Sequence, residues 1–340
     1  MRAENQSSNI PQKTVLLVLG MHRSGTSLLA SLLAELGCSG PVTLMPANEN
    51  NKNGYFESLP IYHLNDDILK EAGSYWNDWR SVNMRRISSS RKEYFKEKAK
   101  KIVKEEFLNN NIIYIKDPRI CKLLPFWQNV LGELGFKILF INTHRNPVDV
   151  SASLHKRDEI DLGLGLLVWL RYVLEAENFS RGNKRFFTSY SEVLADPLKV
   201  ANSINECFQI LPLYSTENLE KLVDTNLLHH RTSINETIND HKIPVMIRET
   251  LSIFEKWVLY GECSDDYVVL DKYFDYFNGT SELFSDPLHK LEEQARDLQC
   301  ALLDANEAKE ETKKVRAEYT NSTSWKISAP VRLVGKLLRK

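Results

Sequence analysis

Residues 14–36 read TVLLVLGMHRSGTSLLASLLAEL. The run Val15–Leu19 is continuously apolar, as in a strand that is buried on both faces, and the residues from Thr26 onwards repeat with the spacing of a helix. Between them, Gly20 and Gly25 keep the spacing of a phosphate-binding loop, but Thr26 stands where such loops carry their lysine. The stretch therefore predicts a strand, a loop and a helix, with a loop suited to a smaller anion than a nucleoside triphosphate.

The same order of a strand followed by a helix recurs along the chain. Strands that alternate with helices predict a parallel sheet, which binds ligands at the carboxyl ends of its strands. We therefore expect an α/β fold, a three-layer sandwich with a central, mainly parallel sheet, followed by a long C-terminal helix. The expected units are 112–116 with 120–133, 137–143 with a helix from Pro147, and 185–190 with 197–208, besides an amphipathic helix over 91–107 and a buried one over 162–170.

The composition excludes several classes of protein. With 44 basic and 45 acidic residues, the formal net charge is −1, which gives no general attraction to nucleic acid. The five cysteines are far apart and the histidines lack ligand spacing, so we expect neither a disulfide framework nor a metal site. The longest apolar stretch is stopped by Arg171, well short of the ~20 residues of a membrane span. The sequence thus predicts a cytoplasmic protein without a nucleic-acid partner.

The regions of the chain differ in character. Asp286 is expected to cap a long helix whose first position is Pro287. Apolar residues at alternating spacings of four and three leave two alternatives for this helix, packing on its own domain or a coiled-coil homodimer through residues 286–310. The expected regions are a flexible N-terminus over 1–13, a main domain over 14–283, the long helix over 284–320 and a basic amphipathic tail over 321–340.

The tail combines cations with an apolar face. No acidic side chain follows Glu318, and Pro330 can begin a short helix with one apolar side. Such a helix can lie at the inner face of a membrane or dock on the protein's own surface. The cations are Lys326, Arg332, Lys336, Arg339 and Lys340.

A second segment matches the first loop in chemistry. In 143-THRNPVDVSASL-154, a strand ends at Arg145, Pro147 begins a helix, and Ser153 follows the arginine by eight residues. One guanidinium and one hydroxyl can then converge on an anion, as Arg23 and the hydroxyls of the first loop can on another.

Together, the two segments resemble the 5′-phosphosulfate loop and the 3′-phosphate motif of the sulfotransferases that use 3′-phosphoadenosine 5′-phosphosulfate. The resemblance covers about residues 14–230 and implies the P-loop-like sulfotransferase fold, with no metal. It implies that Arg23, Ser24, Gly25, Thr26 and Ser27 bind the 5′-phosphosulfate, Arg145 and Ser153 the 3′-phosphate, and Tyr190 the adenine.

The resemblance also implies roles in the chemistry. Lys116 matches the lysine that stabilises the bridging oxygen, but the family's base histidine falls on Pro118. Other branches use a glutamate, which makes Glu57 the candidate base and Asp117 the reserve, although Glu57 also suits a helix cap or a surface position. Arg119 is a candidate for clamping an acidic acceptor or for a structural ion pair.

We therefore expect a sulfotransferase that acts on a hydroxyl or amine, with a carbohydrate or cell-surface glycan as acceptor. The tail resembles C-terminal segments of bacterial glycan-synthesis enzymes, which favours polysaccharide biosynthesis. The alternatives are a P-loop small-molecule kinase with an atypical loop and a catalytically silent binding module in a glycan-assembly complex. His22 is a candidate contact of the leaving group or an ordinary loop histidine. Each of Trp76, Trp79 and Trp127 is either a core residue or a platform on which a sugar ring packs.

Overall fold

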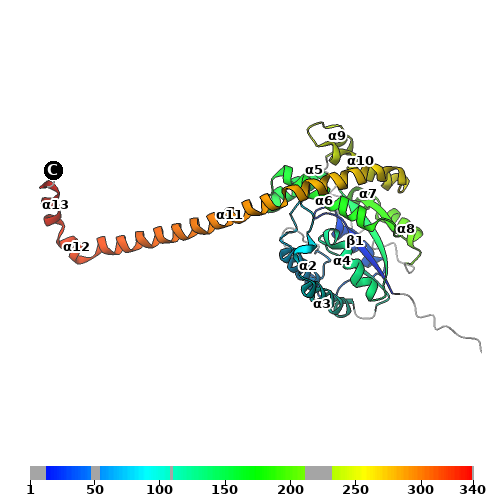
Figure 1. Cartoon of the computed structure of the whole chain (residues 1–340), viewed down its shortest axis with the longest axis horizontal. Coiled ribbons are helices and arrows are strands. Elements are labelled where there is room, and N and C mark those ends of the chain that lie inside the picture. The colour runs from blue at the N-terminus through cyan, green and yellow to red at the C-terminus, as the bar shows by residue number, and fades with distance from the viewer. Residues whose placement is uncertain (1–12, 47–53, 108–109, 211–231, 339–340) are drawn as a thin grey trace, which may run out of the picture. The chain divides into compact units, whose positions relative to one another are not determined.

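The computed structural model describes residues 13–46, 54–107, 110–210 and 232–338. A parallel sheet of four strands lies at the centre of the main domain (Figure 1). Its strands stand in the order β2-β1-β3-β4, so β1 is flanked by β2 on one side and β3 on the other. The expected fold class is confirmed. The strands are β1 (Thr14–Leu19), β2 (Ile112–Lys116), β3 (Lys137–His144) and β4 (Arg185–Ser189).

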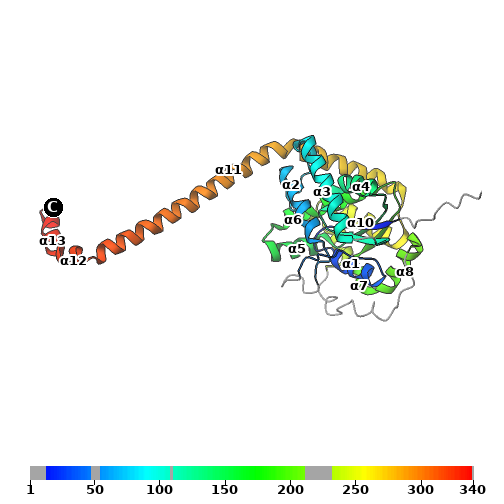
Figure 2. The ribbon, with the colours of Figure 1, turned by 90° about the horizontal axis from the view of Figure 1, so that it is seen from below.

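The sheet has an apolar core on each face, because alternate side chains of a strand point to opposite sides. Leu16 and Val18 belong to one core and Leu17 to the other. The first core is covered by α1 (Thr26–Glu35), α7 (Tyr190–Ala195) and α8 (Pro197–Phe208). The second is covered by α2 (Leu59–Glu71), α3 (Ser89–Phe107), α4 (Ile120–Glu133), α5 (Pro147–Asp158), α6 (Leu162–Ser180) and α10 (Val245–Tyr260) (Figure 2). The remaining elements are η1 (Met84–Arg86), α9 (Ile234–Asn239), η5 (Ser264–Asp266), α11 (Tyr267–Asn321), α12 (Thr323–Ile327) and α13 (Ala329–Leu337).

Local sequence signals explain where several helices begin. Asn146 caps α5 by accepting a hydrogen bond from the amide of Val148 at 3.0 Å, and Pro147 takes the first helical position. Asp196 caps α8 in the same way through the amide of Lys199 at 2.8 Å. Because β3 ends immediately before Arg145, the cap of α5 fixes where this arginine leaves the sheet.

The chain divides into two compact units, Met1–Ser281 and Glu282–Lys340. The expectation that a helix begins at Asp286 is wrong, because α11 is continuous from Tyr267 to Asn321. Pro287 lies inside this helix, where it removes one backbone hydrogen bond. The first turns of α11 bury Leu270 and Phe277 in the main domain, so tertiary packing extends the helix backwards past the local start signal.

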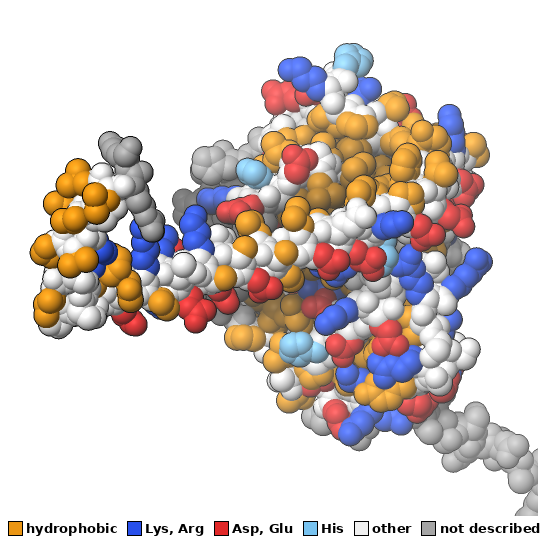
Figure 3. Space-filling model, turned by 60° about the vertical axis from the view of Figure 1, so that its left-hand side comes forward, with side chains coloured by type: hydrophobic (Ala, Val, Ile, Leu, Met, Phe, Trp, Pro, Cys, Tyr) orange, Lys and Arg blue, Asp and Glu red, His pale blue; other side chains and the backbone are white. Residues whose placement is uncertain are grey.

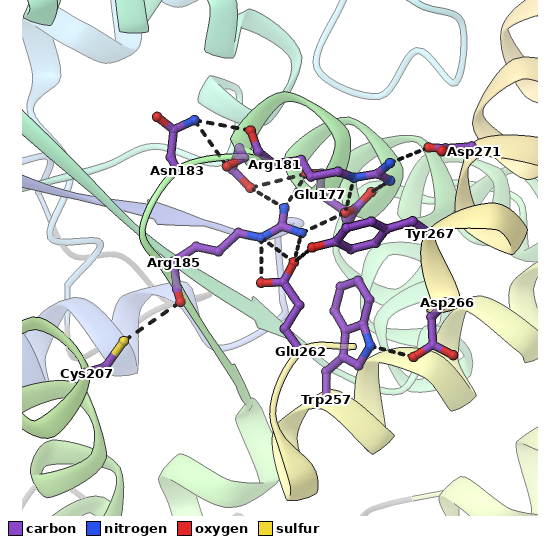
Figure 4. Close-up of polar contacts among 11 residues, drawn as sticks. Glu177, Arg181, Asn183, Arg185, Cys207, Trp257, Glu262, Asp266, Tyr267 and Asp271 are labelled. Atoms are coloured by element: carbon purple, nitrogen blue, oxygen red, sulfur yellow. Dashed lines mark hydrogen bonds and ion pairs between the residues drawn. The ribbon is translucent and has the colours of Figure 1, made fainter. Parts of the chain in front are cut away.

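A network of arginines and carboxylates holds the start of α11 within the main domain (Figure 4). Arg185 of β4 pairs with Glu177 of α6 at 2.9 Å and with Glu262. Arg181 pairs with Glu177 at 2.6 Å and with Asp271 of α11 at 2.5 Å. The buried charges of Arg185 and Glu177 are tolerated because they are paired with each other, and the loss of one alone is costly.

The second unit holds most of α11, followed by α12 and α13. Pro330 lies in the first turn of α13, as expected for the tail. The Arg332 guanidinium lies 3.5 Å from the centre of the Trp325 ring and donates to the Trp325 carbonyl at 2.6 Å. Arg339 and Lys340 lie outside the described residues. None of the described helices combines the length and apolarity that crossing a membrane requires.

Candidate active site

The candidate site lies where the strand order reverses. The chain leaves β1 to one side for β2 and returns across it to β3, so the connections after β1 and β3 diverge at a switch point. The predicted anion-binding residues of 23–27 follow β1, and Arg145 follows β3. Parallel strands place these segments at one edge of the sheet, where open α/β sheets bind their ligands.

The loop after β1 packs tightly against its neighbours. Gly25 has φ +82°, and a Cβ atom there would lie 2.4 Å from Cδ2 of Tyr190, so the position accepts only glycine without rearrangement. A Cβ on Gly20 would lie 2.5 Å from the carbonyl oxygen of Thr143. The amide of Gly20 donates to Sγ of Cys121 at 3.2 Å, a contact that the sequence does not predict.

The structure brings the two predicted anion segments into contact. Nε of Arg23 donates to Oγ of Ser153 at 2.8 Å, and Nη1 of Arg145 lies 3.4 Å from the carbonyl oxygen of Arg23. The Arg145 guanidinium lies over the Tyr190 ring, 4.7 Å from its centre, and 3.6 Å from a carboxylate oxygen of Asp149. The residues assigned to the 5′ and 3′ ends of the donor therefore form one continuous surface.

Buried polar atoms without hydrogen-bond partners concentrate at this edge. Within the described residues, six buried side-chain atoms lack a partner. Four of them, on His22, Ser24, Asn142 and Arg145, lie at the end of β3 or in the segments that follow β1 and β3. Native proteins satisfy nearly all such groups, so a cluster of exceptions makes this edge the candidate ligand site.

The electrostatics of the loop also favour an anion. Burial lowers the pKa of Arg23, and the charges of Arg157 and Arg145 lower it further. The positive charges of neighbouring arginines repel one another, and an anion bound between them relieves this repulsion. The donor set of guanidinium, hydroxyl and amide groups fits phosphate and sulfate without a metal ion.

Lys116 and Glu57 form a buried ion pair beside the loop. The Lys116 ammonium donates to Oγ of Ser27 at 3.2 Å, to the carbonyl oxygen of Tyr55 at 3.1 Å and to Oε1 of Glu57. Burial raises the pKa of Glu57, although the neighbouring Lys116 charge lowers it in part. Glu57 thus lies inside the site and neither caps a helix nor stands on the surface.

The backbone before Glu57 has an unusual conformation. Four non-glycine residues in the described parts of the chain have positive φ, and two of them, Glu159 and Gln209, simply end helices. The other two are Arg23, with φ 66°, and Phe56, with φ 56°. Strained backbone of this kind concentrates at functional sites, and here it precedes the candidate base and lies within the anion loop.

Asp117 and Arg119 belong to a structural network. Asp117 is fully buried and accepts from the Arg119 amide at 2.9 Å, from Nη1 of Arg119 at 3.2 Å and from Nδ2 of Asn65 at 3.2 Å. Nε of Arg119 pairs with Asp66 at 2.6 Å, and its guanidinium lies over the ring of Tyr62. Both oxygens of Asp117 are engaged, which favours a positioning role over that of a base.

An aromatic group adjoins the loop and is not evident from sequence spacing. The His22 ring lies 4.7 Å from that of Trp76 and 5.8 Å from that of Tyr172, measured between ring centres. The Tyr172 hydroxyl donates to the Trp76 carbonyl at 2.7 Å, and the Arg157 guanidinium lies over the Trp76 ring. Burial, followed by the charge of Arg119, holds the pKa of His22 well below its usual value, so its imidazole is neutral.

The three tryptophans considered above separate clearly in the structure. Trp127 is buried and donates to Oδ1 of Asn65 at 2.8 Å, which makes it a core residue. Trp79 packs against Phe277 of α11. Trp76 alone of the three contacts His22 of the loop, at a half-buried position.

Among the described residues, no group of three potential metal-ligating side chains lies close enough together to hold an ion. All five cysteines are free thiols.

No protein-family model and no curated protein matches the sequence. Among solved structures, the chain is similar to the sulfotransferase STF1 from Mycobacterium tuberculosis H37Rv, with a TM-score of 0.39 and 16% identity over 71% of this chain and 76% of that one. It is also similar to the sulfotransferase domain of the Synechococcus PCC 7002 olefin synthase, with a TM-score of 0.36 and 16% identity over 81% and 99% of the two chains. A third similar structure is retinol dehydratase in complex with androsterone and the inactive cofactor PAP, with a TM-score of 0.30 and 14% identity over 82% of each chain. These likenesses concern the fold alone, and none of them extends to a substrate or a reaction.

Proposed function

We propose that the protein is a sulfotransferase that moves the sulfuryl group of 3′-phosphoadenosine 5′-phosphosulfate to a hydroxyl or amine of a carbohydrate. The observation that carries the proposal is the convergence of two arginines, Arg23 and Arg145, with unpaired polar atoms on the loop after β1. A single anionic group would use the loop alone, whereas a donor with phosphate groups at both ends uses both segments.

The chain offers a place for each end of the donor. The loop residues 23–27 and the N-terminus of α1 would hold the 5′-phosphosulfate, because backbone amides and the helix dipole attract anions there. Arg145 and Ser153 would hold the 3′-phosphate. Tyr190 lies against both Gly25 and Arg145, which supports a position for its ring beside the adenine.

When bound, the donor supplies the sulfuryl group and leaves as adenosine 3′,5′-bisphosphate. We assign the acceptor proton to Oε2 of Glu57, since Oε1 accepts from Lys116. A carboxylate whose pKa is raised by burial is a better base than one in water. The Lys116 ammonium lies within 3.2 Å of Ser27 in the donor loop, where its charge can stabilise the departing phosphate oxygen.

A carbohydrate acceptor is supported by Trp76. Its half-buried ring adjoins His22 of the loop, and an aromatic face beside a reactive site is a suitable platform for a sugar ring. Arg157 lies over the same ring and adds a cation next to the platform. This arrangement favours an acceptor with both an apolar sugar face and polar or anionic groups.

The test of the function is Glu57→Gln with Glu106→Gln as the matched control. Glu106 is also buried, and it accepts from Ser58, the residue that follows Glu57, at 2.8 Å. We expect Glu57→Gln to keep donor affinity while lowering turnover by roughly a hundredfold or more, as the loss of a general base does. Glu106→Gln should leave turnover within a small factor of the wild type. Turnover of Glu57→Gln equal to that of the control would remove the assignment.

The same assay separates the alternatives. A P-loop kinase predicts protection by ATP with Mg²⁺ and leaves Arg145 and Ser153 without a role. A silent binding module predicts that the wild type binds adenosine 3′,5′-bisphosphate but shows no transfer from labelled donor to any glycan. Transfer of label by the wild type that is lost in Glu57→Gln contradicts both.

The tail supports a peripheral location at the inner face of a membrane. Apolar side chains gather on α12 and α13 (Figure 3), and Ile327, Val331, Val334 and Leu338 are exposed. Cations on the same segment would add ~1 kcal/mol each at an anionic surface. Deleting 325–340 should abolish co-sedimentation with anionic liposomes without changing turnover on a soluble acceptor, and undiminished sedimentation would rule out the tail as the anchor.

A further inference from the structure

We infer that α11 pairs with α11 of a second copy of this chain, through a two-stranded coiled coil over residues 284–305. The inference concerns an interaction surface of the second unit and stands apart from the proposed reaction.

The exposure of α11 changes abruptly along its length. Its start buries Leu270, Tyr273, Phe277 and Ser281 in the main domain. Between Glu282 and Asn321, by contrast, no residue is buried. A stretch of 40 residues would span ~60 Å at 1.5 Å per residue, and it leaves large apolar side chains in water. Helical stability in proteins comes mostly from packing of an apolar face, so a partner that covers these side chains would stabilise this stretch.

Seven apolar residues of this stretch form one seam, and Leu283 and Leu303 are exposed outside it. Seven residues follow one another at spacings of four and three, which are the core positions of a coiled coil. The same spacing already runs through Leu270, Phe274, Phe277 and Ser281, so the seam continues an existing packing face of the helix. The seam residues are Phe284, Leu288, Leu291, Ala295, Leu298, Leu302 and Ala305.

The charges beside the seam identify the partner as a second copy. In a pair of helices, the two positions next to the seam on each turn face the partner, and like charges there drive identical chains apart. Of the six such residues between 292 and 308, only Glu292 is charged, the others being Gln294, Gln299, Ala301, Asn306 and Ala308. Of the nine positions on the far side between 289 and 307, six carry a full charge, namely Lys290, Glu293, Arg296, Asp297, Asp304 and Glu307.

This distribution suits self-association. Charged residues lie on the side that stays in water, and near-neutral residues flank the seam, so two identical helices can approach without repulsion. A partner of opposite charge would instead favour charged flanking positions. The leucine and alanine side chains of the seam are self-complementary in size, which lets each copy fill the spaces offered by the other.

The test compares two neighbouring leucines in the full-length protein. Leu302 lies on the seam and is 60% exposed, whereas Leu303 lies on the far side and is 57% exposed. Both therefore have the same surroundings in a single copy, and only pairing distinguishes them. The variants are Leu302→Glu and Leu303→Glu, measured by sedimentation velocity across a range of micromolar concentrations.

We expect a dimer for the wild type and for Leu303→Glu. Leu302→Glu should weaken the dimer on the order of a hundredfold or more, because a carboxylate would be buried in the seam without a partner. A monomeric wild type, or an equal response of the two variants, overturns the inference. So does a monomer in which Leu302→Glu speeds amide exchange in residues 14–281, because the seam would then pack on its own domain.

Discussion

Replacing Arg145 by alanine separates the two ends of the proposed donor site. Its Nε is buried without a partner, and the nearest carboxylate, on Asp149, is 3.6 Å from the guanidinium. A 3′-phosphate would satisfy that donor, and a charge-assisted hydrogen bond contributes ~1.5–3 kcal/mol, or roughly 10- to 150-fold in affinity. Because the unpaired donor is removed as well, the unliganded protein should lose little stability beyond the contacts of Arg145 with Tyr190, Asp149 and the Arg23 carbonyl oxygen.

The assay is calorimetric titration of wild type and variant with adenosine 3′,5′-bisphosphate and with adenosine 5′-monophosphate. We expect Arg145→Ala to weaken the bisphosphate by the factor above and the monophosphate by much less, so that the preference for the 3′-phosphate collapses. Arg157→Ala is the control, since Arg157 lies in the last turn of α5, the helix that follows Arg145, but contacts Asp158 and Trp76. Equal losses for both nucleotides in Arg145→Ala would refute the assignment.

Two further outcomes follow from the structure. Gly25→Ala and Gly182→Ala both place alanine at positive φ, +82° and +80°, which costs ~1–2 kcal/mol of stability in each variant. Only the alanine at position 25 would also clash with Tyr190. We therefore expect only Gly25→Ala to abolish donor binding, as measured by calorimetry. Burial raises the pKa of Glu175 to about 7, against 4.5 in the unfolded chain. Between these pH values the folded state keeps a proton that the unfolded state has lost. The contribution of Glu175 to the free energy of unfolding therefore falls as pH rises from 4.5 to 7. Glu175→Gln should remove that decline, about 3 kcal/mol in the free energy of unfolding, as measured by urea denaturation at both pH values; an unchanged decline in the variant would assign it to another group.

The sheet and the helices around it could be predicted because their signals are local. An apolar run as short as Val15–Leu19 favours a buried strand. A cap followed by proline begins a helix at Asn146 and at Asp196. The start of α11 could not be predicted in this way. Packing of Leu270 against the main domain outweighs the start signal at Asp286, and that contact depends on the tertiary structure.

The candidate site also has a part that the sequence predicts and a part that it does not. The anion-binding residues lie directly after strands, so the parallel sheet itself brings Arg23 and Arg145 together. The aromatic group does not follow a strand: Trp76 comes from the connection between α2 and α3, and Tyr172 from the middle of α6. Their meeting at His22 depends on how helices pack on the sheet, which the spacing of residues along the chain does not encode.

The contact between Arg23 and Ser153 joins the two ends of the proposed donor site. Ser153 accepts from Nε of Arg23 at 2.8 Å, and a hydroxyl that accepts one hydrogen bond still has its own proton to donate. If a 3′-phosphate accepts that proton, the hydrogen bond from Ser153 to the phosphate polarises the hydroxyl, which strengthens the hydrogen bond that Ser153 accepts from Arg23. The Arg23 guanidinium is thereby fixed at Nε. On the proposed assignment, recognition of the 3′-phosphate therefore orients the cation at the reacting end, so a donor without that phosphate would lose alignment as well as affinity.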